Sequence, residues 1–110
     1  MAIIDYFKIC SDETRLRILL LLKEKSLCVC QMQSILEAAQ SKLSKHLSKM
    51  RDLKIVRATQ EGKFVIYSLN EDLFLANILQ AVEKQGIFVK DQERINEFDH
   101  LLEVSSCGSE

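Results

Sequence analysis

The segment from Gln40 to Leu53 constrains the fold of this chain more than any other. Its apolar side chains recur at the spacing of an amphipathic helix with one face turned to a core, at Leu43, Leu47, Met50 and Leu53. The other faces hold hydroxyls, amides and cations, and no carboxylate precedes Asp52. Such a face can donate hydrogen bonds to phosphates and reach base edges in a major groove. We therefore predict a DNA-reading helix with the contact residues Gln40, Ser41, Lys42, Ser44, Lys45, His46 and Lys49.

The alternative, a lysine-rich face that only meets solvent, is weakened by the elements predicted on either side. Residues 28–37 have a helical apolar pattern, and the pair Ala38-Ala39 joins them to the next helix through a very short turn. Two short helices joined by a tight turn, the second polar and basic, are typical of a helix-turn-helix. Upstream, we predict a short apolar helix over residues 2–9 and a core helix over 14–23, capped by Ser11 or Asp12.

A β-hairpin is predicted directly after the basic helix. Residues 55–60 and 63–69 are rich in β-branched and aromatic side chains, and they flank Glu61-Gly62, where glycine supplies the positive φ of a tight connection. Arg57 and Lys63 are expected near the tip of this hairpin, where they would contact the phosphate backbone. The predicted fold class is therefore mainly α with a β-hairpin wing, a winged helix-turn-helix.

Charge is distributed unevenly along the 110 residues, although the net charge is only −1. Residues 42–63 hold seven basic side chains against two acids, whereas residues 64–110 hold three against nine. This pattern is expected where one patch meets a polyanion and the remainder keeps the protein soluble. The length fits one domain, which we place at residues 1–104, followed by a polar tail at 105–110.

The terminal segments predict a homodimer. Residues 71–85 form a helix that is apolar around much of its circumference, and residues 91–103 resume a helical pattern after Gly86. Because a core of this size cannot readily absorb so much apolar surface, we assign these helices and residues 2–9 to a dimer interface. A two-fold dimer would present two reading helices to a palindromic site in double-stranded DNA. Packing within one monomer is the alternative.

No apolar run is long enough for a membrane span, and the chain does not open like a signal peptide. A cytoplasmic protein with no membrane contact and no permanent cofactor is therefore expected. In that reducing compartment, cysteines are expected to act as thiols, ligands or redox groups rather than structural disulfides. The four cysteines are Cys10, Cys28, Cys30 and Cys107.

Several of these segments together resemble the ArsR/SmtB family of winged-helix metalloregulators, over roughly residues 5–75. The matching stretches are Phe7-Lys8, Ser11–Leu19, Leu27–Cys30, Gln40–Leu47 and the wing Glu61–Leu69. The resemblance implies a homodimeric transcriptional repressor, not an enzyme, that releases operator DNA when an inducer arrives. The Leu-Cys-Val-Cys segment looks most like that of arsenic- and cadmium-responsive members. It implies As(III), Sb(III) or Cd(II) as the inducer and Cys28 with Cys30 as its ligands.

The ligand set is incomplete when compared with the family pattern. Arsenic-sensing members often carry a third cysteine three residues after Cys-Val-Cys, where this chain has Gln33. A third sulfur would come from Cys10 or Cys107, of either subunit, and the sequence leaves that choice open. Side chains two residues apart on a regular helix point ~200° apart. We therefore expect Cys28 and Cys30 to share an ion only if the first turn of their helix unwinds, which would displace the reading helix.

Three other functions fit parts of the sequence. The first is a repressor of the same fold that responds to oxidants or persulfides through its cysteines, with no metal ligand. The second, a thiol oxidoreductase, is disfavoured because the chain has neither Cys-x-x-Cys nor a βαβ pattern. The third, a helical interaction module, predicts no salt-dependent binding to any duplex.

Overall fold

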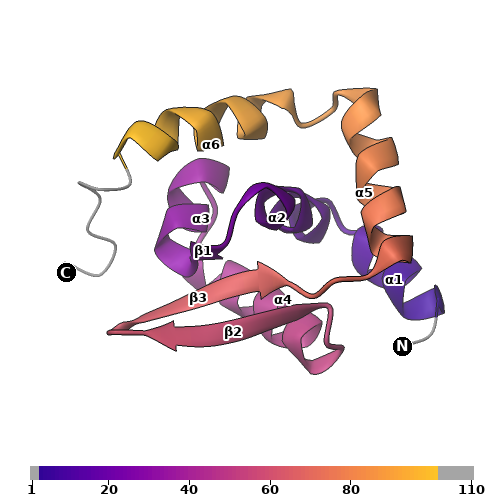
Figure 1. Ribbon diagram of the computed structural model, residues 1–110, viewed down its shortest axis with the longest axis horizontal. Helices are drawn as coiled ribbons and strands as arrows, with labels where there is room; N and C mark the ends of the chain where they lie inside the picture. The colour runs from indigo at the N-terminus through magenta and orange to yellow at the C-terminus, as the bar shows by residue number, and fades with distance from the viewer. Residues whose placement is uncertain (1–2, 102–110) are drawn as a thin grey trace.

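The computed structural model describes residues 3–101, and the side chains of residues 3–97. The protein is mainly α-helical with one small antiparallel sheet, as predicted (Figure 1). The helices are α1 (Ile3–Cys10), α2 (Glu13–Glu24), α3 (Val29–Leu36), α4 (Gln40–Asp52), α5 (Leu73–Gln85) and α6 (Val89–Leu101). The strands are β1 (Leu27–Cys28), β2 (Val56–Glu61) and β3 (Phe64–Leu69). Within residues 3–101, no helix has both the length and the apolar character needed to cross a bilayer.

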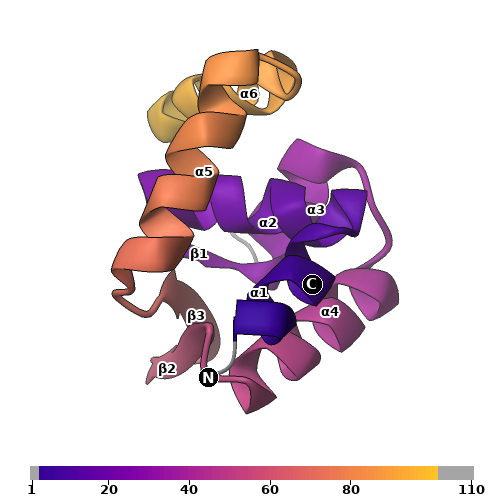
Figure 2. The same cartoon turned by 90° about the vertical axis from the view of Figure 1, so that its right-hand side faces the viewer.

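Helix α2 is the centre of the fold. The five residues from Ile18 to Leu22 are each at most 5% exposed, so α2 is covered on every side. Asp12 caps its first turn by accepting a hydrogen bond from the Arg15 amide at 2.9 Å, as predicted. Figures 1 and 2 show α6 on one side of α2, with α4 and the hairpin on the other. The same core contains Met32 and Ile35 of α3, Leu43, Leu47 and Met50 of α4, Leu75 and Leu79 of α5, and Ile95 of α6.

The sheet has three strands in the order β1-β3-β2, one more than predicted. The additional strand, β1, pairs with β3 through Leu27 opposite Tyr67 and Cys28 opposite Ile66. Leu27 and Cys28 are strand residues, so the expected helix start at Cys28 is wrong and α3 begins at Val29. Their backbone hydrogen-bonding groups are used by a strand that arrives about forty residues later in the chain.

The hairpin connection lies one residue later than predicted. Glu61 still pairs with Phe64, so the connecting residues are Gly62 and Lys63 rather than Glu61 and Gly62. Gly62 has φ +63°, a left-handed value that glycine adopts without a steric cost. This shift places Lys63 at the tip of the wing.

Helix α6 packs within the monomer, which the sequence offered only as the alternative. It begins at Val89, and Ile95 is 2% exposed against α2 and α3. Arg17 of α2 donates two hydrogen bonds to the buried carboxylate of Asp91, both at 2.8 Å. Asp91 and Ile95 therefore belong to the monomer core rather than to a dimer interface, whereas Glu93, Asn96 and Glu97 are exposed. Residues 102–104 and the predicted tail at 105–110 lie outside the described residues.

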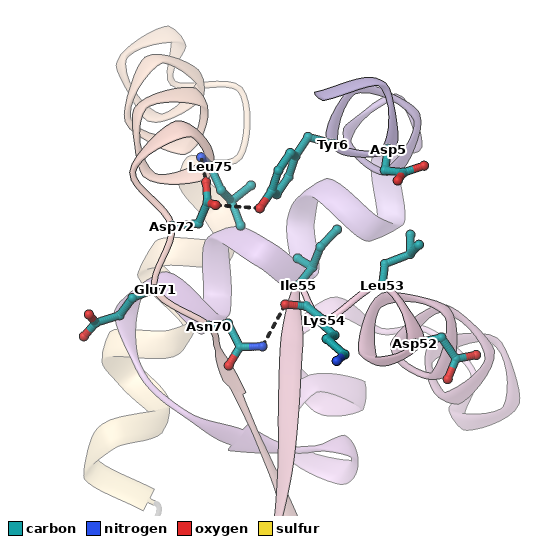
Figure 3. Close-up of a pocket in the computed structure, with 10 residues that line it drawn as sticks. All are labelled: Asp5, Tyr6, Asp52, Leu53, Lys54, Ile55, Asn70, Glu71, Asp72 and Leu75. Carbon is teal, nitrogen blue, oxygen red and sulfur yellow. Dashed lines mark hydrogen bonds between the residues drawn. The ribbon is translucent and has the colours of Figure 1, made fainter. Parts of the chain in front are cut away.

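Helices α1 and α5 meet through an aromatic contact and through a hydrogen bond from Tyr6 to Asp72, the residue before α5, and Figure 3 shows the hydrogen bond. The Tyr6 ring packs edge-on against Phe74 with 5.5 Å between ring centroids, and its hydroxyl donates to Asp72 at 2.7 Å. Burial and this hydrogen bond raise the pKa of Tyr6 to about 12, so the hydroxyl keeps its proton and continues to donate. The outer faces of the same two helices stay apolar and exposed, at Ile3, Ile4, Phe7 and Leu73.

Candidate DNA-reading helix and thiol pair

Helix α4 divides into a buried face and a basic face, as its sequence predicts. Leu43, Leu47 and Met50 have no exposed surface. The helix starts at Gln40 without a side-chain cap, so its first amide groups point outward and can donate to a bound anion. The exposed predicted contacts are Gln40, Ser41, Lys42, Lys45 and Lys49, with Ser44 half-buried.

His46 does not lie on the exposed side of α4, and that expectation is wrong. Its side chain is 16% exposed and faces the start of α2. The His46 ring has Nδ1 at 3.4 Å from Nη1 of Arg15 and Nε2 at 3.8 Å from Oδ2 of Asp12. Sequence periodicity could not reveal this, because Arg15 lies 31 residues earlier in the chain.

The two basic residues of the wing lie at its opposite ends. Lys63 is exposed in the connecting turn, with its ammonium 6.0 Å from the centre of the Phe64 ring. Arg57 lies at the base of the hairpin, where it donates to the Leu69 carbonyl at 2.9 Å and to Oδ1 of Asn70 at 3.3 Å. The expectation that Arg57 is near the tip is therefore wrong: it follows the first residue of β2 and pairs with Ser68.

The sulfur atoms of Cys28 and Cys30 lie 3.4 Å apart. Cys30 is disulfide-bonded in this structure, so the expectation that the cysteines form no disulfide is wrong at this residue. Cys28 is the residue before α3, and its backbone is extended, with φ −90° and ψ 167°. Its amide donates to Oε1 of Gln31 at 2.9 Å, which satisfies one of the free donors at the start of α3. The expected ~200° separation assumed that Cys28 is helical. Because Cys28 is extended, its side chain turns toward Cys30, and no turn of helix has to unwind.

This spacing fits two thiolates on one soft ion. Two sulfurs bound at ~2.3 Å to one ion lie ~3.8 Å apart at a tetrahedral angle and ~3.4 Å apart at an angle of about 95°. Cys10 ends α1, before the 12 residues of α2, and its role as a third ligand, from either subunit, stays a prediction. Burial raises the pKa of the Cys10 thiol, although Arg15 opposes the shift. Among residues 3–97, no three His, Cys, Asp or Glu side chains gather as a metal site, and Cys107 lies outside the described residues.

The turn between α3 and α4 is held by a residue that sequence reasoning missed. Glu37 ends α3 in the left-handed region, with φ 54°. Arg94 of α6 donates to the Ile35 carbonyl at 2.9 Å and pairs with the Glu37 carboxylate at 3.2 Å. An arginine at this position satisfies a carbonyl in the last turn of α3 and complements the helix dipole. No local pattern predicts it, because Arg94 lies 59 residues after Ile35.

Known proteins are similar to this chain both in sequence and in fold. The family profile described as "Bacterial regulatory protein, arsR family" matches residues 12–58. A Staphylococcus aureus cadmium resistance transcriptional regulatory protein, a CadC homolog, is 35% identical over 109 residues, which is 98% of this chain and 77% of that protein. The arsenical resistance operon repressor of Escherichia coli is 44% identical over 61% of this chain and 58% of its own length.

The fold comparison agrees with the sequence comparison. HlyU from Vibrio cholerae superposes with a TM-score of 0.66 at 30% identity, over 72% of this chain and 85% of that one. The predicted winged helix-turn-helix is thus confirmed, and the match to the S. aureus protein extends beyond residues 5–75 to α5 and α6. The chain therefore belongs to the ArsR family of bacterial regulatory proteins and is a DNA-binding transcriptional repressor rather than an enzyme.

Proposed function

We propose that this repressor is induced by a thiophilic ion, As(III), Sb(III) or Cd(II), which binds the Cys28–Cys30 pair and releases operator DNA. The observation that carries the proposal is the 3.4 Å separation of the two sulfurs. Thiolates select soft ions. Relatives named for cadmium and arsenical resistance support this class of inducer.

The position of the thiol pair suggests how its state reaches both DNA-contacting elements. Cys28 belongs to β1, which is hydrogen-bonded to β3 of the wing. Cys30 belongs to α3, which is joined to α4 by the short turn through Glu37. An ion bound by both sulfurs would therefore contact β1 and α3 at once, and through them it would act on the wing and on the reading helix.

We further propose that the repressor binds DNA as a homodimer through α1 and α5. The exposed apolar side chains on these helices are Ile3, Ile4, Phe7 and Leu73, with exposed fractions from 55% to 78%. An apolar surface of this kind is typical of an interface. A two-fold axis through it would present two copies of α4 to successive turns of one duplex.

The DNA contacts proposed are the exposed residues of α4 together with the wing. Lys45→Ala should weaken binding of all duplexes about fivefold and flatten the plot of log K against log salt by ~0.9, because one phosphate contact is lost. Fluorescence anisotropy over a salt series measures both quantities. Lys90→Ala is the matched control, because Lys90 is exposed on α6, on the opposite side of α2 from α4. Equal slopes for wild-type protein and Lys45→Ala would contradict the assignment of this face.

The inducer is tested by titrating the repressor on a duplex selected from a random library by the wild-type protein. Cys30 is disulfide-bonded in this structure, so the protein is fully reduced before each titration. Arsenite, antimonite and Cd(II) are compared with Zn(II) and with peroxide in separate arms. Release by a soft ion supports the proposal. Release by peroxide alone would instead support the thiol-redox repressor.

A further inference from the structure

A polar joint holds the middle of α4 against the corner between α1 and α2. Arg15 donates through Nε to the Ile9 carbonyl at 3.1 Å and through Nη2 to the Lys8 carbonyl at 3.2 Å, so its guanidinium caps the last turn of α1. The remaining nitrogen, Nη1, lies 3.4 Å from Nδ1 of His46 on α4. One side chain thus connects the end of α1, the first turn of α2 and the reading helix.

The joint fixes the protonation state of His46. A guanidinium only donates hydrogen bonds, so Nδ1 of His46 must accept, and the ring proton is assigned to Nε2, which faces Asp12. Burial lowers the pKa of His46 below its ordinary value. The charges of Arg15, Lys42 and Lys45 also lower this pKa, while Asp12 opposes them. His46 is therefore neutral near neutral pH.

We propose that His46 is a positioning residue for DNA binding. Its neutral ring, held by Arg15, fixes how α4 is rotated about its axis relative to the corner between α1 and α2. The inference rests on the DNA-contacting face of α4 proposed above. At 16% exposure, the His46 side chain has little surface to offer a duplex. Lys42 and Lys45, which precede His46 on α4 by four residues and by one, are exposed and depend on that rotation for their direction.

The joint also links the reading helix to the proposed dimer surface. Arg15 binds the last carbonyl groups of α1, the helix that exposes Ile3, Ile4 and Phe7. Two reading helices can enter successive grooves only if each has a defined orientation to the two-fold axis. A rigid contact between α1 and α4 supplies that orientation.

The pH dependence of operator affinity distinguishes a positioning role of His46 from a direct contact with DNA. Acid should weaken binding in the first case and strengthen it in the second. Protonated His46 can no longer accept from Arg15, and two cations then face each other. Positioning therefore predicts binding about tenfold weaker at about pH 5 than at about pH 8. A direct phosphate contact predicts tighter binding in acid, because the ring gains a positive charge. Tighter binding would overturn the inference.

Two variants test whether the weaker binding in acid arises from the His46 side chain. His46→Asn keeps a neutral acceptor near the position of Nδ1, so it should recover most of the affinity that His46→Ala loses and should lose the acid dependence. His100→Asn alters the other histidine of the chain and should keep the wild-type pH profile. Acid dependence that persists in His46→Asn would overturn the inference.

A double-mutant cycle tests the partner. If His46 acts through Arg15, then Arg15→Gln combined with His46→Ala should weaken binding no more than the larger single change. Additive losses would mean that His46 contacts DNA independently and would overturn the inference. If the wild-type protein bound no duplex in a salt-dependent way, the assignment of α4 as the DNA-contacting face would itself be contradicted. The two failures are thus distinguishable.

Discussion

A repressor in which Cys28 and Cys30 are both replaced by serine should bind its operator and fail to release it on addition of arsenite or Cd(II). Hydroxyl groups are poor ligands for soft ions, so the inducer concentration for half-release should rise by at least about a hundredfold. The fold should tolerate the change, because Cys28 is the N-cap of α3 and serine is a favoured residue there. Anisotropy of a labelled operator during inducer titration measures the shift.

The single variants and a matched control make this result specific. Cys28→Ser and Cys30→Ser should each lose most of the response, because one remaining sulfur cannot chelate. Cys10→Ser should respond like the wild type, because Cys10 lies beyond the other end of α2. A double serine variant that still lets go of DNA at the wild-type inducer concentration would refute the role of the thiol pair. A loss of response in Cys10→Ser would indicate that a third sulfur crosses the dimer.

The elements of this fold that depend on local spacing could be predicted from the sequence. The acid-free face of residues 40–53 identified α4 to within one residue at its end, and the Asp12 cap gave the start of α2. Both signals lie within a few residues of the structure they determine. The same holds for the wing, whose two strands flank a glycine with positive φ.

Two of the expectations that failed depend on partners distant in the chain. Cys28 is extended because it pairs with Ile66, and this pairing turns its sulfur toward Cys30. His46 is half-buried because Arg15 reaches it from α2. In both cases the local pattern predicted the helix correctly, α3 or α4, but it gave the wrong direction for one side chain, Cys28 or His46. Helical periodicity assigns a face, and only tertiary contacts decide what covers it.

Asp91→Asn should lower the free energy of unfolding by about 3 kcal/mol, the largest change expected from one polar substitution in this chain. The Asp91 side chain is 4% exposed and accepts both hydrogen bonds of the Arg17 guanidinium, whose side chain is 24% exposed. That carboxylate raises the pKa of Arg17, and asparagine would leave the guanidinium charged and without a counter-charge. Urea unfolding at a fixed protein concentration measures the loss, since a dimer unfolds in a concentration-dependent way.

Two comparisons separate the buried pair from ordinary surface charge. Lys23 pairs with Glu83 of α5 at 2.9 Å, but their side chains are 33% and 26% exposed, so Glu83→Gln should cost less than about 1 kcal/mol. Replacing both members of the buried pair, as Arg17→Met with Asp91→Leu, should recover most of the stability, because no uncompensated charge remains. Arg94 acts from the same helix on the end of α3, so loosening α6 should also speed amide exchange in the turn before α4. If Asp91→Asn unfolded at the same urea concentration as Glu83→Gln, α6 would be held by apolar packing around Ile95 rather than by this ion pair.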